Sequence, residues 1–168
     1  SKKNNEFNNF ITKEPLGSIF IIAPWNYPYN TSVNSIIPSL LSGNTVILKH
    51  SSQTPLCAEQ LFKAAKKSNL PEGVFQFMHL DHKSTSKIIA DNRIDHVLFT
   101  GSVSGGRQVK KAIGERFINA GLELGGKPIE ECVDLCRARL AILARTQSSF
   151  VACFFFCCLC AFRAQSSW

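Results

Sequence analysis

Short apolar runs alternate with polar segments along the first part of the chain. The runs are rich in Ile, Val, Leu and Phe and cover residues 18–24 (SIFIIAP), 44–49 (NTVILK), 74–78 (VFQFM) and 96–100 (HVLFT). Runs of this length and composition predict buried strands, and the intervening segments are long enough to hold helices. Strands that alternate with helices favour parallel pairing through crossover helices. The pattern therefore predicts an α/β fold with an open, doubly wound parallel sheet.

Helix signals are clearest after the second run. Thr54 can act as an N-cap, Pro55 suits the first helical turn, and residues 69–73 (NLPEG) predict the end of this helix. Its apolar face is expected to consist of Leu61, Phe62 and Ala65. A further helix is expected after Ser104, with an apolar side made of Val109, Ala112 and Ile113. In a Rossmann-like sheet of this kind ligands bind at the carboxyl ends of the strands, so the segments that follow the strands form the candidate site.

The composition of the chain changes abruptly after Lys127. Six of the seven cysteines follow this residue, whereas no lysine does. We therefore expect an incomplete α/β domain over residues 1–127 and an atypical Cys- and Phe-rich tail over 128–168, for which a frameshifted or aberrant end is a serious candidate. The apolar run 150–162 is shorter than the roughly 20 residues that span a bilayer, so no membrane span is predicted. A competing hypothesis is that residues 132–143 form a helix that docks on the sheet.

Composition and charge limit the classes of function. A chain of 168 residues that is 45% hydrophobic can bury the core of one domain. Its net charge of +7 is spread over single basic residues and pairs, without the basic stripe or zinc-finger spacing typical of nucleic-acid binding. The phosphates of a dinucleotide would suit this charge equally well. The polar N-terminus lacks the features of a secretory signal, so a cytoplasmic location with reduced thiols is expected.

Four segments at the ends of expected strands carry the candidate chemistry. They are PWNYP (24–28), the lysine that ends TVILK (45–49), FTGSVSGG (99–106) and, after a fifth expected strand, ELGGK (123–127). In this order and spacing the segments resemble the motifs of the aldehyde dehydrogenase family. The resemblance implies NAD or NADP as cofactor and a small aldehyde as the substrate that is oxidised to a carboxylic acid. It also implies a middle slice of a longer enzyme that lacks the oligomerisation elements, so the isolated chain is expected to be inactive.

Two residues in these motifs take catalytic roles from the resemblance. Asn26 matches the asparagine whose amide stabilises the oxyanion formed when a cysteine attacks the aldehyde, a step that needs a neutral donor. Glu123 matches the general base that activates water. The alternatives are a turn asparagine between two prolines and a solvated glutamate at the edge of a strand.

The segment after the second strand is expected to contact the ribose of the cofactor. Lys49 ends a buried strand, where a cation needs an acceptor, and the family places its ribose-binding lysine here. Ser52 stands where the common pattern has a glutamate, which would bind a ribose 2′-hydroxyl and repel a 2′-phosphate; its loss predicts tolerance of NADP. The alternative for Ser52 is an ordinary loop serine. His50 replaces a common proline and is expected to be a surface substitution.

The glycine-rich turn after the fourth strand opens a helix whose N-terminus can receive a pyrophosphate. The resemblance assigns Gly101 and Ser102 to this contact. It also assigns Trp25 and Leu124 to cofactor binding, with Leu124 against the nicotinamide ring. Many α/β turns need glycine for geometry only, which is the alternative for Gly101.

The reaction also requires a thiolate nucleophile. Cys157 lies at about the family's interval from Glu123, but its surroundings, FFFCCLC, lack the Gly-Gln approach of the family, and matches by spacing are common in a cysteine-rich tail. No metal site is predicted, because the tail cysteines have neither a nearby histidine nor a zinc-site spacing. Two alternative functions follow: a non-catalytic dinucleotide-binding or interaction module that kept the fold, and a truncated product that does not fold stably.

Overall fold

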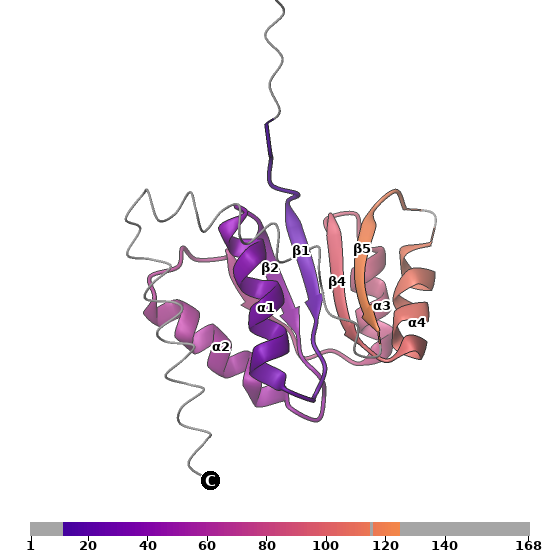
Figure 1. The fold of residues 1–168 in the computed structure, drawn as a ribbon, viewed down its shortest axis with the longest axis horizontal. Coiled ribbons are helices and arrows are strands. Elements are labelled where there is room, and N and C mark those ends of the chain that lie inside the picture. The colour runs from indigo at the N-terminus through magenta and orange to yellow at the C-terminus, as the bar shows by residue number, and fades with distance from the viewer. Residues whose placement is uncertain (1–11, 115, 125–168) are drawn as a thin grey trace, which may run out of the picture.

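A parallel sheet between two layers of helices makes up the described part of the chain, residues 12–114 and 116–124 of a computed structural model (Figure 1). The strands are β1 (Ser18–Ile22), β2 (Thr45–Lys49), β3 (Phe75–Phe77), β4 (His96–Gly101) and β5 (Asn119–Leu124). The helices are α1 (Pro28–Leu41), α2 (Pro55–Lys67), α3 (His82–Ala90) and α4 (Val103–Ile113). Among these residues the sheet has five strands in the order β3-β2-β1-β4-β5 and does not close on itself. The predicted open, doubly wound α/β fold is therefore confirmed.

The path of the chain reverses direction once along the sheet. It begins at the central strand β1, adds β2 and β3 on one side, and then returns through α3 to place β4 on the other side of β1. The reversal point of such a sheet lies between β1 and β4, and ligands bind there because the connections from the two strands diverge to opposite faces.

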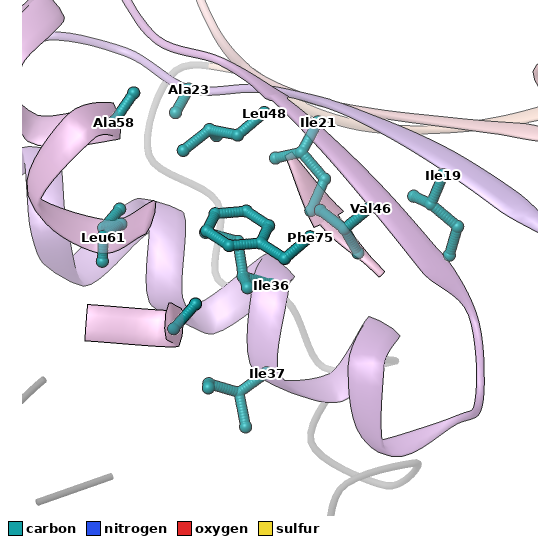
Figure 2. Packing of buried hydrophobic residues seen from close by; sticks show 11 residues of the cluster. Ile19, Ile21, Ala23, Ile36, Ile37, Val46, Leu48, Ala58, Leu61 and Phe75 are labelled. Carbon is teal, nitrogen blue, oxygen red and sulfur yellow. The ribbon is translucent and has the colours of Figure 1, made fainter. Parts of the chain in front are cut away.

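The two faces of the sheet carry separate apolar clusters. In β1, Ile19 and Ile21 point into the cluster beneath α1 and α2, whereas Phe20 and Ile22 point into the cluster beneath α3 and α4. Figure 2 shows the first of these clusters, with residues of β1 and β2 packed against the two helices. Because both faces are covered, β1 reads as a continuous apolar run rather than an alternating one. Phe20 is completely buried, which contributes roughly 2–3 kcal/mol of transfer free energy.

The start of α2 lies where it was predicted, with one difference in mechanism, whereas α4 begins at Val103, before the expected Ser104. Thr54 occupies the N-cap position of α2, as expected, but its side chain makes no capping hydrogen bond. Its hydroxyl pairs instead with the ring of His50. Asp81 and Ser102 do cap with their side chains, accepting from the backbone N–H of Ser84 (2.8 Å) and Gly105 (3.1 Å).

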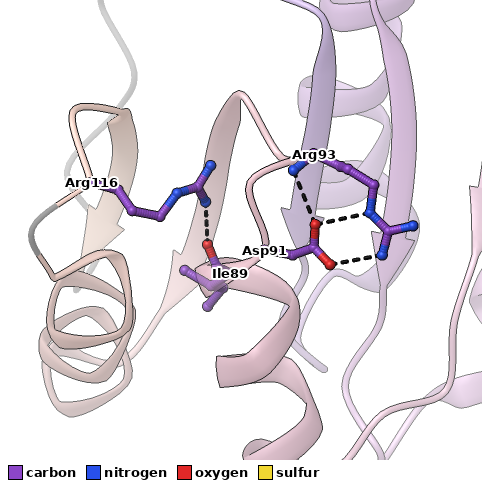
Figure 3. Close-up of polar contacts among 4 residues, drawn as sticks. All are labelled: Ile89, Asp91, Arg93 and Arg116. Atoms are coloured by element: carbon purple, nitrogen blue, oxygen red, sulfur yellow. Dashed lines mark hydrogen bonds and ion pairs between the residues drawn. The ribbon is translucent and has the colours of Figure 1, made fainter.

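Polar contacts stabilise the edge of the sheet at which the strands begin, opposite their carboxyl ends. The guanidinium of Arg116 donates to the carbonyl oxygens of Ile89 and Ile94, each at 2.6 Å, and so joins the end of α3 to the segment before β5. Arg93 donates to both carboxylate oxygens of Asp91 next to it (Figure 3). This edge is therefore stabilised by contacts within the fold.

The described residues contain neither a candidate membrane span nor a candidate metal site. No helix among them has both the length and the apolar character needed to cross a membrane. No group of three or more His, Cys, Asp or Glu side chains in residues 12–114 and 116–124 is arranged to hold a metal ion.

Candidate functional site

The strand register brings the predicted site segments to one edge of the sheet. Ile22, the last residue of β1, lies opposite Lys49 of β2 on one side and opposite Phe99 of β4 on the other. Beyond β4, Gly101 lies opposite Leu124 of β5. The segments that leave these strands therefore lie along the carboxyl edge of the sheet, where the sequence places the candidate site.

The segment after β1 projects into solvent. Trp25 is 60% exposed, Asn26 is exposed, and Tyr27 has a left-handed backbone (φ 47°) at the N-cap position of α1. Within the described part of the chain the Asn26 amide makes no hydrogen bond, so it is free to donate to a ligand. The left-handed conformation of this turn thus falls on Tyr27 rather than on Asn26.

Lys49 is a buried cation at the end of β2. Its side chain has an exposed fraction of 7%, and burial lowers its pKa below the usual lysine range. Residues 12–114 and 116–124 provide no hydrogen bond or ion pair for its ammonium group. No described side-chain nitrogen is both enclosed and unpaired, so the ammonium group of Lys49 keeps contact with solvent and is open to an anionic or hydroxyl-bearing ligand.

His50 is not a surface substitution, and this expectation was wrong. Its ring is only 3% exposed and lies between the starts of α1 and α2. Nε2 lies 3.2 Å from the carbonyl oxygen of Pro28, and Nδ1 lies 3.0 Å from the hydroxyl of Thr54. Burial, together with the neighbouring charge of Lys49, lowers the pKa of the imidazole. The spacing of His50 and Thr54, four residues apart, is the signal that could have suggested this pair.

Ser52 lies in the loop between β2 and α2, exposed to solvent. Its hydroxyl has no hydrogen-bond partner among the described residues, in keeping with a position open to a ligand. Its role as a ribose or phosphate contact stays a prediction.

The glycine-rich turn after β4 is shaped by the ring of Phe99. A Cβ at Gly101 would lie 2.7 Å from Phe99 Cζ, and a Cβ at Gly105 would lie 2.6 Å from the same atom. Glycine is thus required here by packing, whether or not a ligand approaches. Ser102 caps α4, whose first N–H groups face the carboxyl edge of the sheet. Glycine thus has a packing role in this turn, and the N-terminus of α4 also presents N–H groups that could bind an anion.

Glu123 and Leu124 lie one strand further along the edge. Glu123 is opposite Thr100, and partial burial raises the pKa of its carboxyl group above the usual glutamate value. Leu124 packs close to Gly106, where an added Cβ would lie 2.6 Å from Leu124 Cδ2, and belongs to the cluster beneath α3 and α4. Leu124 thus has a packing role that the sequence did not suggest. Cys157 lies outside the described residues.

A pair of residues that sequence reasoning missed joins the first turns of α1 and α2. The thiol of Cys57, which is buried, hydrogen-bonds with the hydroxyl of Tyr29. Burial, followed by the effect of Cys57, raises the pKa of Tyr29 to about 12, and burial raises the pKa of the thiol. Both groups are therefore protonated at neutral pH and act as a structural link.

A hollow of about 560 Å³ lies away from this edge, between α2 and β3. Its lining includes Phe62, Lys66 and Gln76, and none of the predicted site residues contributes to it. The topology of the sheet, rather than this hollow, therefore marks the candidate site.

Comparison with known proteins agrees with the motifs at the carboxyl edge. The model of the aldehyde dehydrogenase family matches residues 1–150. An aldehyde dehydrogenase of Paenarthrobacter nicotinovorans is 35% identical over 153 residues, which cover 89% of this chain and 33% of the relative. The chain therefore spans about one third of the length of this curated relative.

Two solved structures share the fold at a TM-score of 0.65. One is succinic semialdehyde dehydrogenase from Streptococcus pyogenes in complex with NADP⁺, at 31% identity, covering 68% of this chain and 25% of that one. The other is an NAD-dependent aldehyde dehydrogenase from Sinorhizobium meliloti, at 35% identity, covering 68% and 23% of the two chains. With its sheet order, strand-end motifs and family match in agreement, the chain belongs to the aldehyde dehydrogenase family.

Proposed function

We propose that this chain is a dinucleotide-binding part of an NAD(P)-dependent aldehyde dehydrogenase that oxidises an aldehyde to a carboxylic acid. The observation that carries the proposal is the largely buried Lys49, whose ammonium group has no acceptor among the described residues and lies at the carboxyl end of β2, beside β1. On one side of it the Asn26 segment leaves β1, and on the other side of β1 the turn at Gly101 opens α4.

Each residue of the edge supplies a contact that suits a dinucleotide. Lys49 donates to a ribose hydroxyl or phosphate oxygen, and this acceptor offsets the cost of its burial. The N-terminus of α4, capped by Ser102, presents N–H groups and positive potential to the pyrophosphate. When bound, the dinucleotide supplies the nicotinamide ring that accepts hydride. Trp25 and Leu124 are proposed to border the cofactor as well.

For the chemical step, Asn26 and Glu123 are the residues we propose. The exposed Asn26 amide donates to the oxygen of the aldehyde as negative charge develops on it. Glu123 accepts a proton, and its raised pKa brings it closer to neutral pH, which suits a general base. The proposed nucleophile is Cys157, whose thiolate attacks the aldehyde carbon.

Ser52 supports use of NADP as well as NAD. A hydroxyl at this position neither repels a 2′-phosphate nor holds the ribose diol as a carboxylate would, and the nearby Lys49 can pair with a phosphate. That the relative from Streptococcus pyogenes holds NADP⁺ supports this proposal.

Four further expectations remain proposals. We place the boundary of the α/β unit at Lys127, although the family match extends to residue 150. We expect a cytoplasmic location. We also expect that elements for oligomerisation are missing from this chain, and that it does not turn over aldehyde alone because it spans about one third of its relative.

Calorimetric titration of the purified chain with NAD and with NADP tests the cofactor site. We expect both to bind, with Lys49→Met weakening each by at least about tenfold, or roughly 1.4 kcal/mol. Lys63→Met, which removes an exposed lysine of α2, is the matched control and should change neither affinity. A cooperatively folded chain that binds neither dinucleotide at millimolar concentration would overturn the proposal.

A second assay separates the enzyme from a non-catalytic binding module. The chain is incubated with NAD or NADP and small aldehydes, and NAD(P)H formation is followed by absorbance. We expect none from the isolated chain. Turnover that is abolished by Cys157→Ser would show an active enzyme with Cys157 as nucleophile.

A further inference from the structure

His50 links three segments that the proposed site needs in fixed positions. One ring nitrogen contacts the first turn of α1, which follows the Asn26 segment, and the other contacts Thr54 at the start of α2. His50 itself follows Lys49 directly. The ring is 3% exposed, so water does not compete for either hydrogen bond.

The chemistry of the two partners fixes the tautomer. The Pro28 carbonyl oxygen only accepts, so Nε2 must carry the proton and donate at 3.2 Å; the same oxygen also accepts from the Ser32 hydroxyl at 2.7 Å. In a neutral ring Nδ1 is then bare and accepts from the Thr54 hydroxyl at 3.0 Å. A second proton is disfavoured by burial and by the adjacent Lys49. His50 is therefore held as the neutral Nε2–H form.

Two further bonds hold the same region. The backbone N–H of Ala23 donates to the carbonyl oxygen of Lys49 at 3.0 Å, which extends the β1–β2 pairing into the segment that leads to Asn26. Tyr29 and Cys57 hydrogen-bond between the first turns of α1 and α2. Between these fixed points, the His50–Thr54 pair is one of three links within the loop that carries Ser52. In the other two, the backbone N–H of Thr54 donates to the carbonyl oxygen of Ser51 at 3.1 Å, and the backbone N–H of Gln53 donates to the Ser51 hydroxyl at 3.3 Å.

We infer that His50 is a positioning residue of the dinucleotide site, which uses its two hydrogen bonds to hold Lys49 and the Ser52 loop in the arrangement that binds the ribose and its phosphate. This inference rests on the proposed function. His50 does not touch the dinucleotide in this assignment; it reduces the ordering that the loop must undergo on binding.

Matched variants of the full chain test the role through affinity for NAD and NADP. His50→Ala removes both hydrogen bonds and should weaken binding by about tenfold or more. Thr54→Val removes the hydroxyl at nearly constant shape and should weaken binding by several fold, whereas Thr54→Ser keeps the hydroxyl and should retain wild-type affinity. The double variant His50→Ala with Thr54→Val should lose little more than His50→Ala alone.

A spectroscopic measurement tests the two hydrogen bonds of His50 directly. In ¹⁵N-labelled chain, long-range proton–nitrogen correlation should show His50 with a protonated Nε2 and a bare Nδ1 that accepts a hydrogen bond. Thr54→Val should shift the Nδ1 resonance and leave the exposed His79 unchanged. If His50→Ala does not fold, the affinities of Thr54→Val and of His50→Gln, which keeps a donor for the Pro28 carbonyl, are compared with that of the wild type instead.

The results separate this inference from the proposed function. A chain that binds neither dinucleotide contradicts the proposed function, and with it the assignment of His50 to that site. If the chain binds, a folded Thr54→Val or His50→Ala variant with unchanged affinities, or a His50 ring protonated at Nδ1, overturns the positioning role. Loss of affinity in both variants, with rescue by Thr54→Ser, supports it.

Discussion

The ring of Phe99 fills the space that a side chain at Gly105 would need. Because Cζ of the ring also lies against Gly101, the ring cannot retreat from one glycine without losing its fit to the other. The carboxyl end of β4 and the start of α4 are thus packed through one aromatic side chain. The conformation of the proposed pyrophosphate turn is therefore determined by the core.

We predict that Gly105→Ala destabilises the fold by about 1–3 kcal/mol. In an exposed helix position alanine is more favourable than glycine by about 1 kcal/mol. A loss of stability in Gly105→Ala would therefore be due to the contact with Phe99. Phe99→Leu should reverse much of the loss in the double variant. Urea unfolding measures both, with Gln108→Ala on the exposed side of α4 as the control. A stabilised Gly105→Ala would contradict this packing.

A carboxylate at position 52, in the loop between β2 and α2, should make the chain bind NAD more tightly than NADP. We expect Ser52→Glu to weaken NADP binding by about tenfold or more, roughly 1.4 kcal/mol, and to leave NAD binding equal or stronger. Ser52→Gln is the matched neutral control and should discriminate less. Equal affinities for NAD and NADP in Ser52→Glu would mean that residue 52 does not lie near the ribose.

The charge of Lys49 should make NADP binding sensitive to alkaline pH. Burial lowers its pKa from the usual 10.5, so the ammonium loses its proton at a lower pH than an exposed lysine does. As the pH rises through this lowered pKa, the dissociation constant for NADP should increase, because the phosphate loses its cationic partner. The dependence should disappear in Lys49→Gln. Titration calorimetry over the alkaline range up to 10.5 provides the comparison.

The ionised carboxylate of Glu123 should lower the free energy of unfolding at neutral pH, and this effect should be absent in acid. Its pKa is raised from 4.5 by burial, so the folded state holds the proton more tightly than the unfolded state. The penalty for the ionised carboxylate develops as the pH rises through 4.5 and is complete above the raised pKa. Glu123→Gln should therefore stabilise the chain by less than about 1 kcal/mol at pH 7, because the group is only partly buried, and the gain should vanish in acid. Exposed Glu72→Gln is the control, and thermal melts at both pH values are the measurement. An equal gain at both pH values would count against this assignment.

Truncation should locate the end of the α/β unit. We expect deletion of residues 128–168 to improve solubility and to leave dinucleotide affinity unchanged, since every cofactor residue in the proposed site precedes Lys127. A second truncation after residue 150, where the family match ends, is the comparison. If only the longer chain melts cooperatively, residues beyond Lys127 belong to the fold.

Strands such as β1 could be predicted because their apolar side chains are buried on both faces of the sheet, so composition alone separates them from the helices; the order β3-β2-β1-β4-β5 was not predicted. The place of the candidate site could be predicted as well, because parallel strands bring their carboxyl ends, and the motifs that follow them, to one edge of the sheet. The roles of His50 and Leu124 were predicted incompletely because they depend on partners from other elements: the Pro28 carbonyl for His50 and the close approach of Gly106 for Leu124. Local sequence carries no record of such contacts.

The central position of β1 has a consequence for the order in which the chain can assemble. The β1–β2 contact spans 27 positions and the contact of β1 with the start of β4 spans 77, so closing the second loop costs about 1 kcal/mol more in chain entropy. As the chain leaves the ribosome, β1 can pair with β2 while its other edge, and the side chains of Phe20 and Ile22, remain uncovered until β4 emerges. Synthesis that stops between β3 and β4 would leave an apolar strand edge open to other chains, the species in which aggregation should begin.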